Sequence, residues 1–276
     1  MSDALSKITS IMQQNHCMDI SPYDVGFVVR ILEKRQLETR LADLSEYSDF
    51  LASDHQEAET FFGNLHNTFS LFFREPLTFA YLEQSLLPCI VSSKTNENEI
   101  RIWSAGCSGG QEPYSLAILL SELKEASQKE IRFRIFATDR CPEALAEATA
   151  GVYPEAAVQN VKKRHLDQYF HSTGGRYEIK PELKKHIEFS NYDLLDTTTA
   201  YPPESIFGNF DVVMCSNLLI YYKHEFRDFI IHKIRNAVSQ DGYLITGEAE
   251  KMLVNSICGM KAMDSNLPIF KNHKRG

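Results

Sequence analysis

The chain has 276 residues, of which 43% are hydrophobic and 24% charged, an ordinary globular composition that excludes wholesale disorder. This length matches roughly two domains at about 150 residues each. The net charge of −8, from 29 basic and 37 acidic residues, argues against a general nucleic-acid binder.

Cysteine usage and the absence of apolar runs indicate the compartment. The six cysteines are scattered and form no CxxC pair, which predicts reduced, mostly buried thiols rather than a disulfide framework. The N-terminus lacks the basic start and apolar run of a signal peptide, and no uncharged apolar stretch approaches the roughly 20 residues of a membrane span. We therefore expect a cytoplasmic protein that does not insert into a membrane.

The first 80 residues predict helices. Apolar residues recur at three- and four-residue steps over 25–44 and again after Ser45, and 57–73 carries a heavy aromatic face, which predicts one helix. Pro88 is expected to end the helical pattern before the polar stretch 92–99. We expect an N-terminal helical domain over 1–80, followed by a linker helix and loop over 81–99.

From residue 100 onward, strand and helix patterns alternate. The pattern predicts strands at 100–105, 133–138, 187–192, 210–215, 242–246 and 268–270, and helices at 114–126, 142–149 and 226–238. This alternation predicts an α/β domain over 100–276 with a doubly wound, mainly parallel sheet. A helical pattern at 161–169 and a hairpin pattern around Gly174 predict a small β-subdomain inserted at about 154–186.

Ligands of such sheets bind outside the carboxyl ends of the strands, so the residues after each strand are the candidates. Gly106, Gly109 and Gly110 follow the first strand without the GxGxxG spacing or the lysine of a phosphate loop, and a tight turn explains them about equally well. Glu112 stands where the helix begins and suits a cationic group. Asp139 ends the second strand, where an acid binds ribose hydroxyls or caps a helix. Together they predict a nucleoside ligand without phosphate, which S-adenosylmethionine fits.

Two later strand ends add weaker candidates. Asp193 and Leu194 follow the third strand, where they suit an adenine ring, although a solvated turn is the commoner reason for such a pair. Ser216 and Asn217 follow the fourth strand at the same edge. Tyr221 comes one turn later, where a buried structural tyrosine is the usual alternative.

Several runs of sequence resemble one known family. Residues 68–76 read TFSLFFREP, 102–117 read IWSAGCSGGQEPYSLA, 137–139 read ATD, 150–153 read AGVY and 210–222 read FDVVMCSNLLIYY. These runs resemble the CheR-type chemoreceptor glutamate methyltransferases, from about residue 27 to 270. The resemblance implies a class I S-adenosylmethionine methyltransferase fold for the sheet domain.

The resemblance also implies a reaction and a set of site residues. S-adenosylmethionine is the expected cofactor and S-adenosylhomocysteine the product, with glutamate side chains of chemoreceptor helices as acceptors. Arg74 and Tyr221 would border the reacting methyl group. In some members the β-subdomain grips a receptor tail peptide. The expected cofactor-binding residues, including Gly106 from the glycine loop, are Thr68, Ser70, Arg74, Gly106, Glu112, Asp139, Asp193, Leu194, Ser216 and Asn217.

This chain departs from the family pattern at several positions. Thr68 stands for the usual Asn, Ser70 for Thr and Ser216 for Arg, and residues 248–251 read EAEK in place of HSEN. Residues 1–75 carry six Lys and Arg against twelve Asp and Glu, where a basic surface is expected for acidic receptor helices. Two alternatives stay open: a cofactor-binding sensor or docking module, and a methyltransferase for another carboxylate. None of the nine His shows ligand spacing, so we expect no metal.

Overall fold

The structure is a computed structural model that describes residues 2–66, 69–94, 99–127, 130–257 and 259–273. The chain divides into two compact units: Met1–Asn67 with Ile220–Arg227, and Thr68–Leu219 with Asp228–Gly276. The domain limits expected at residues 80 and 99 stay a prediction, because compactness alone does not define a domain. No helix in the described ranges is long and apolar enough to cross a membrane.

The first unit is helical, as its periodicity predicts. An aspartate caps three of its helices: Asp24 accepts the Phe27 N–H, Asp43 accepts two N–H groups, and Asp54 accepts the Glu57 N–H. Several of the acids in this unit therefore serve its fold. Its helices are α1 (Ser2–His16), α2 (Val25–Thr39), α3 (Leu44–Ser53) and α4 (His55–Leu65).

A distant segment of the chain, Ile220–Arg227, completes the first unit. The N–H of Asp24 donates to the carbonyl of Tyr221 at 2.8 Å. The rings of Tyr23 and Tyr222 stack with their centroids 5.4 Å apart, and both residues are buried. The sequence pattern alone gave no sign of this association.

The helix predicted over 57–73 is wrong at its C-terminal end, since α4 ends at Leu65. Beyond it, Phe72 packs in the second unit, where its ring lies 4.9 Å from Tyr153 and 5.4 Å from Phe170. The aromatic periodicity was misleading because the aromatic side chains of one continuous run enter two different cores.

Pro88 does not end the helical pattern as predicted. Helix α5 (Pro76–Tyr81) continues through a π-helical turn, η1 (Leu82–Leu86), into α6 (Leu87–Ser93), and Pro88 lies in the first turn of α6. A proline inside a regular α-helix lacks an N–H and clashes with the carbonyl four residues earlier. The wider π turn before it accommodates both effects.

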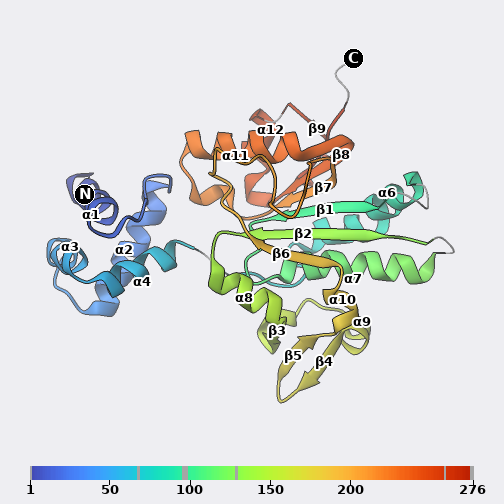
Figure 1. The fold of residues 1–276 in the computed structure, drawn as a ribbon, viewed down its shortest axis with the longest axis horizontal. Coiled ribbons are helices and arrows are strands. Elements are labelled where there is room, and N and C mark those ends of the chain that lie inside the picture. The colour runs from blue at the N-terminus through green and yellow to red at the C-terminus, as the bar shows by residue number, and fades with distance from the viewer. Residues whose placement is uncertain (1, 67–68, 95–98, 128–129, 258, 274–276) are drawn as a thin grey trace. The chain divides into compact units, whose positions relative to one another are not determined.

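The second unit is built around a seven-stranded sheet in the order β6-β2-β1-β7-β8-β10-β9. Figure 1 labels its parallel strands β6, β2, β1, β7 and β8. The strands from β6 to β8 pair in parallel, and β10 pairs antiparallel with β8. The chain moves one way from β1 to β2 and β6, and the other way from β1 to β7 and β8. Right-handed crossovers therefore place α7 and α8 on one face and α11 on the other. This is the doubly wound α/β fold that the sequence predicts.

Five of the six predicted strands agree with the observed ones within one residue at each end, but β8 begins at Val238, four residues before its predicted start and at a residue predicted to be helical. The main difference among the helices is that α7 begins three residues early, directly after Gly110 in the left-handed region. From residue 100 onward, and apart from the insertion, the helices and strands are β1 (Ile100–Ala105), α7 (Gln111–Ala126), β2 (Phe133–Asp139), α8 (Pro142–Ala150), β6 (Ile187–Asn191), β7 (Phe210–Cys215), η3 (Leu219–Tyr221), α11 (His224–Ala237), β8 (Val238–Thr246), η4 (Glu248–Glu250), α12 (Lys251–Ile257), β9 (Lys261–Ala262) and β10 (Ile269–Lys271). Of these, η3 and α11 lie partly in the segment Ile220–Arg227 of the first unit.

The predicted insertion is a three-stranded antiparallel sheet in the order β3-β5-β4. The chain enters this small sheet directly after α8 and continues from it into β6 (Figure 1). Phe170 and Ile179 face each other in the hairpin, and both are buried against the main core. Its elements are β3 (Val152–Pro154), η2 (Glu155–Val158), α9 (Lys163–Tyr169), β4 (Phe170–Thr173), β5 (Arg176–Ile179) and α10 (Pro181–Lys184).

Candidate functional site

The carboxyl ends of four neighbouring parallel strands form one edge of the second unit. Ala105 at the end of β1 lies opposite Thr138 of β2, and Asp139 lies opposite Asn191 of β6. Strand β7 pairs with β1 on its other side. The residues predicted after each of these strands are therefore brought to one edge.

The loop after β1 depends on glycine. Gly106 has φ +80°, Ser108 has φ +50° and Gly110 has φ +88°, so three of five residues lie in the left-handed region. A Cβ on Gly110 would lie 2.8 Å from the Cβ of Ala148 in α8. Position 110 therefore requires glycine for two reasons: other residues rarely adopt this φ, and a side chain there would collide with α8.

A buried tyrosine of the insertion also holds this loop. The hydroxyl of Tyr153 donates to the carbonyl of Gly109 at 2.7 Å. Burial raises the pKa of Tyr153 far above its usual range, so the hydroxyl stays protonated. The loop geometry thus depends on β3 as well as on the sheet.

Glu112, in the first turn of α7, has an unusual electrostatic setting. Burial raises its pKa to about 7, the hydrogen bond from Ser104 opposes the rise, and the charges of Glu75 and Glu250 add to it. The Ser104 hydroxyl donates to Glu112 Oε1 at 2.7 Å. In the part of the chain that the structure describes, no basic side chain pairs with Glu112. A bound cation would supply the missing countercharge.

Asp139 ends β2 and shapes the site. Its Oδ2 accepts the Ser108 N–H at 2.8 Å and its Oδ1 accepts the Cys141 N–H at 2.9 Å. Burial raises the pKa of this carboxyl, and these backbone N–H groups oppose the rise. Each oxygen keeps a second lone pair that a ligand hydroxyl can use. Asp139 therefore holds the loop after β1 and the start of α8, and its binding of a ribose stays a prediction.

The end of β6 contributes one buried apolar side chain and one acid. Leu194 is buried, and Asp193 Oδ1 accepts the Leu195 N–H at 2.9 Å. This bond closes a local turn, which is the alternative to adenine binding that the sequence left open for Asp193.

Two acids that the sequence analysis did not single out hold the end of β7. The Asn217 N–H donates to Glu250 Oε2 at 2.9 Å, and its side-chain Nδ2 lies 3.4 Å from Glu75 Oε1. Burial raises the pKa of Glu75. Glu75 stands inside the FFREP run, which was its only signal, and Glu250 stands in the EAEK departure.

The remaining predicted residues lie before α5 or in the first unit. The Arg74 guanidinium lies over the Phe69 ring, 5.6 Å from its centroid, and donates to the Phe69 carbonyl at 3.1 Å. Thr68 lies outside the described residues. Tyr221 belongs to the first unit, where its ring centroid lies 4.7 Å from that of Phe27. The joint action of Arg74 and Tyr221 stays a prediction.

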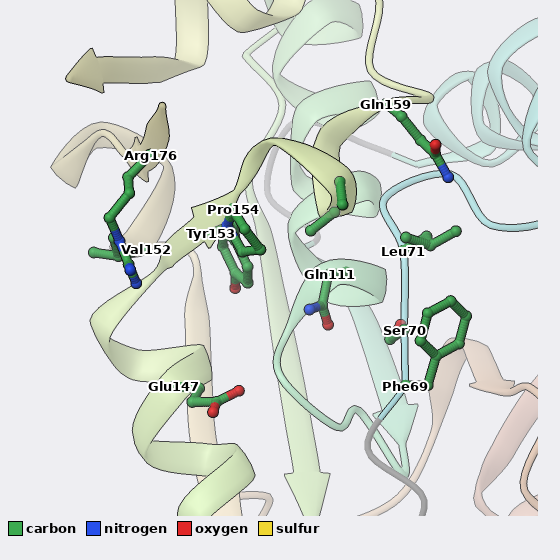
Figure 2. Close-up of a pocket in the computed structure, with 12 residues that line it drawn as sticks. Phe69, Ser70, Leu71, Gln111, Glu147, Val152, Tyr153, Pro154, Gln159 and Arg176 are labelled. Atoms are coloured by element: carbon green, nitrogen blue, oxygen red, sulfur yellow. The ribbon is translucent and has the colours of Figure 1, made fainter. Parts of the chain in front are cut away.

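A cavity of about 480 Å³ lies beside the loop that precedes Arg74 (Figure 2). Ser70 is the predicted cofactor residue that lines it, together with Gln111 from the start of α7 and Arg176 from β5. Figure 2 shows that Ser70, Gln111 and Arg176 come from three separate segments of the chain.

The residues at this edge fit S-adenosylmethionine. The ligand carries a sulfonium and an ammonium group, and Glu75 and Glu112 are carboxylates whose pKa burial raises. Asp139 has spare acceptor capacity for ribose hydroxyls, and Leu194 is an apolar side chain just after β6. Within the described ranges, no group of three His, Cys, Asp or Glu side chains could hold a metal ion.

The fold and this site define a class I S-adenosylmethionine-dependent methyltransferase. Residues 68–265 match the family model described as "CheR methyltransferase, SAM binding domain". This match covers more than half of the chain, which therefore belongs to the CheR methyltransferase family and uses S-adenosylmethionine.

The chain resembles several curated proteins. It is 29% identical over 269 residues to the "Chemotaxis protein methyltransferase" of Borreliella burgdorferi, covering 92% of this chain and 89% of that protein. It is 34% identical over 187 residues to "Chemotaxis protein methyltransferase 1" of Pseudomonas aeruginosa, covering 66% of each. It is also 30% identical to an uncharacterised protein of Rhodobacter capsulatus, of which it spans 26%.

Solved structures resemble the chain more distantly. The N-methyltransferase NodS from Bradyrhizobium japonicum is 16% identical with a TM-score of 0.38, over 71% of this chain and 87% of that one. The DszA carbon methyltransferase is 15% identical with a TM-score of 0.39, over 80% of this chain and 47% of that one. At these scores the likeness adds nothing to the assignment, which rests on the family model and the sheet topology.

Proposed function

We propose that this chain transfers the methyl group of S-adenosylmethionine to glutamate side-chain carboxylates of a chemoreceptor. The observation that carries the proposal is Glu112, a carboxylate with a pKa raised to about 7 and no basic partner among the described side chains. It stands where the loop after β1 meets α7. A cationic ligand at this edge relieves the cost of ionising it.

The proposed mechanism needs no general base. A glutamate carboxylate has a reference pKa of about 4.3 and is already ionised at neutral pH. S-adenosylmethionine supplies an electrophilic methyl group: a C–O bond to the acceptor forms as the C–S bond breaks, and the electron pair stays on sulfur. The chain then acts mainly by positioning the reactants, which can contribute several kcal/mol, on the order of 7–11 at best.

The residues have distinct proposed roles. Glu112 binds the ammonium group and Asp139 the ribose, while Ser70, Asp193, Leu194, Ser216 and Asn217 complete the cofactor site. Arg74 offers a forked contact to the acceptor carboxylate, and Tyr221 a hydroxyl donor. Both orient the acceptor, because holding the ground-state carboxylate too tightly would slow its attack.

The proposed partners follow from the family. The acceptor is a cytoplasmic helix of a chemoreceptor or a receptor-like protein, and the β3-β5-β4 sheet is the proposed contact for a receptor tail peptide. We propose a cytoplasmic location, where such helices are accessible. The proposed cofactor domain runs from residue 100 onward, with the motif at 68–76 joining it to the helical domain.

The first experiment is calorimetric titration of the purified chain with S-adenosylmethionine and S-adenosylhomocysteine. Asp139→Asn and Glu112→Gln are titrated alongside, and both are expected to bind at least about tenfold more weakly. The second step is transfer of labelled methyl to receptor cytoplasmic fragments, with release of the label by mild base as the sign of an ester.

Each outcome separates the alternatives. Binding together with base-labile label on a receptor fragment supports the full proposal. Binding without methyl transfer to any carboxylate overturns the enzymatic part and favours a sensor or docking module. Label on a different acceptor overturns the chemoreceptor assignment alone.

A further inference from the structure

Glu250 organises the backbone at the end of β7. Its Oε2 accepts the N–H of Asn217 at 2.9 Å and that of Gly247 at 2.8 Å, and its Oε1 accepts the N–H of Leu219 at 2.6 Å. The side chain is fully buried. One carboxylate thus receives three backbone donors, two from the segment after β7 and one from the end of β8.

The segment that Glu250 holds contains a backbone turn in the left-handed region. Asn217 has φ +59°, which asparagine adopts more readily than most other non-glycine residues, and Glu250 fixes the N–H groups on both sides of this turn. The side chain of Asn217 is fixed separately, since its Nδ2 lies 3.4 Å from Glu75 Oε1. Glu75 also accepts the Glu248 N–H at 3.0 Å. Asn217 is therefore held at its backbone by one acid and at its amide by another.

Gly247 makes this arrangement tight. A Cβ at this position would lie 2.8 Å from Asn217 Nδ2, 2.9 Å from Asn217 N and 2.9 Å from Glu250 Oε2. Gly247 has φ −70° and ψ 151°, which any residue adopts, so only these contacts require glycine there. Any side chain at position 247 would displace Asn217 or Glu250.

We propose that Glu250 is a positioning residue of the cofactor site, which fixes the backbone of residues 217–219 so that Asn217 and Ser216 meet the cofactor in one geometry. The inference rests on the proposed function and extends it to a residue outside the predicted site. Glu250 does not act on the reacting atoms, because its carboxylate is fully buried and committed to backbone donors.

The charge of Glu250 also reaches the cofactor site. It is one of the charges that raise the pKa of Glu112, behind burial and the charge of Glu75. The thiols of Cys107 and Cys215 also lie within electrostatic range of Glu112, and their raised pKa values keep both neutral. Removing the charge at position 250 therefore moves the titration of Glu112 to lower pH.

The main test is Glu250→Gln, which keeps the shape but turns one acceptor oxygen into an NH₂ that faces backbone donors. We expect S-adenosylhomocysteine to bind at least about tenfold more weakly by calorimetry, because a buried donor loses its partner. We also expect the variant to keep its affinity down to a lower pH than the unmodified chain does, because the pKa of Glu112 falls when the charge at position 250 is removed. Asp43→Asn is the matched control: Asp43 also accepts two backbone N–H groups, at Ser45 and Glu46, but caps α3 in the first unit.

Gly247→Ala is the second variant, in case Glu250→Gln does not fold. Its backbone conformation is unchanged, so its added methyl acts only on Asn217 and Glu250, and we expect a comparable loss of affinity. The inference is overturned if either variant folds with a lowered melting temperature yet binds S-adenosylhomocysteine with the affinity and pH profile of the unmodified chain. If the unmodified chain binds neither ligand, the proposed function fails before the inference is reached.

Discussion

At the scale of single residues, Glu112 shows a conflict between binding and stability. A carboxyl whose pKa is raised in the folded state holds its proton more tightly there than in the unfolded chain. Its ionisation therefore opposes folding, and the free energy of unfolding falls as pH rises from the ordinary pKa of 4.5 towards about 7. A bound cationic ligand offsets the free-energy cost of ionising Glu112, so a carboxylate that destabilises the free protein can be retained for binding.

Glu112→Gln should stabilise the chain without ligand at about pH 8, by up to about 3 kcal/mol, and the gain should vanish near about pH 5. The amide still accepts the hydrogen bond from Ser104, so packing is preserved. Denaturant unfolding at both pH values measures the difference. An equal effect at the two pH values would contradict the ionisation argument.

The same variant should separate stability from binding. S-adenosylmethionine should raise the melting temperature of the unmodified chain and leave that of Glu112→Gln nearly unchanged, because binding to the native state alone stabilises it. An equal rise in both proteins would show that Glu112 does not contact the ligand.

At the scale of elements, the loop from Gly106 to Gly110 joins β1 to α7 by a route that only small residues permit. Gly110 combines φ +88° with a Cβ position 2.8 Å from Ala148 Cβ and 3.1 Å from its Cα, which belongs to the backbone of α8. Since α8 itself packs on β2 and β6, it cannot give way cheaply.

Gly110→Ala should therefore destabilise the second unit by more than about 2 kcal/mol and weaken cofactor binding. The matched control is Gly174→Ala, where φ is +59° and nothing lies within 4 Å of an added Cβ. That variant should cost only the left-handed backbone strain, about 1–2 kcal/mol, and leave binding unchanged. Equal losses of stability in the two variants would remove the close approach as the cause.

At the scale of the whole molecule, the division into compact units does not follow the order of the chain. Ile220–Arg227 belongs to the first unit, although the residues on either side of it belong to the second. Tyr222 is 5% exposed and stacks on Tyr23. A truncation after residue 67 would therefore leave part of the first unit behind, with its apolar side chains exposed.

Tyr222→Ala should destabilise the first unit by about 3 kcal/mol, as loss of a large buried ring does. Limited proteolysis within α2 measures this effect, and binding of S-adenosylhomocysteine reports whether the second unit stays folded. Ile206→Ala serves as the control, because Ile206 is 93% exposed and should change stability by less than about 0.5 kcal/mol. Unaltered protection of α2 in Tyr222→Ala would contradict the assignment of this segment to the first unit.

The sequence by itself determined the doubly wound sheet, the insertion and the sheet edge to which the predicted site residues of the strand ends belong. These follow from local signals, since strand periodicity, glycine spacing and an acid after a strand each lie within a few residues. Asp139 ends β2, Asn217 follows β7 by two residues, and Glu112 stands in the first turn of α7 after the loop from β1, so each could be proposed from local sequence alone.

Only the tertiary structure decided which residues complete these local elements. Glu250 meets Asn217 across 33 positions of the chain and Glu75 meets it across 142, distances over which a single sequence carries no periodic signal. The tertiary structure also decided that α4 ends at Leu65 and that Tyr222 packs on Tyr23 in the first unit. A run of aromatic side chains indicates burial but does not say in which core, and that choice depends on packing between segments far apart in the chain.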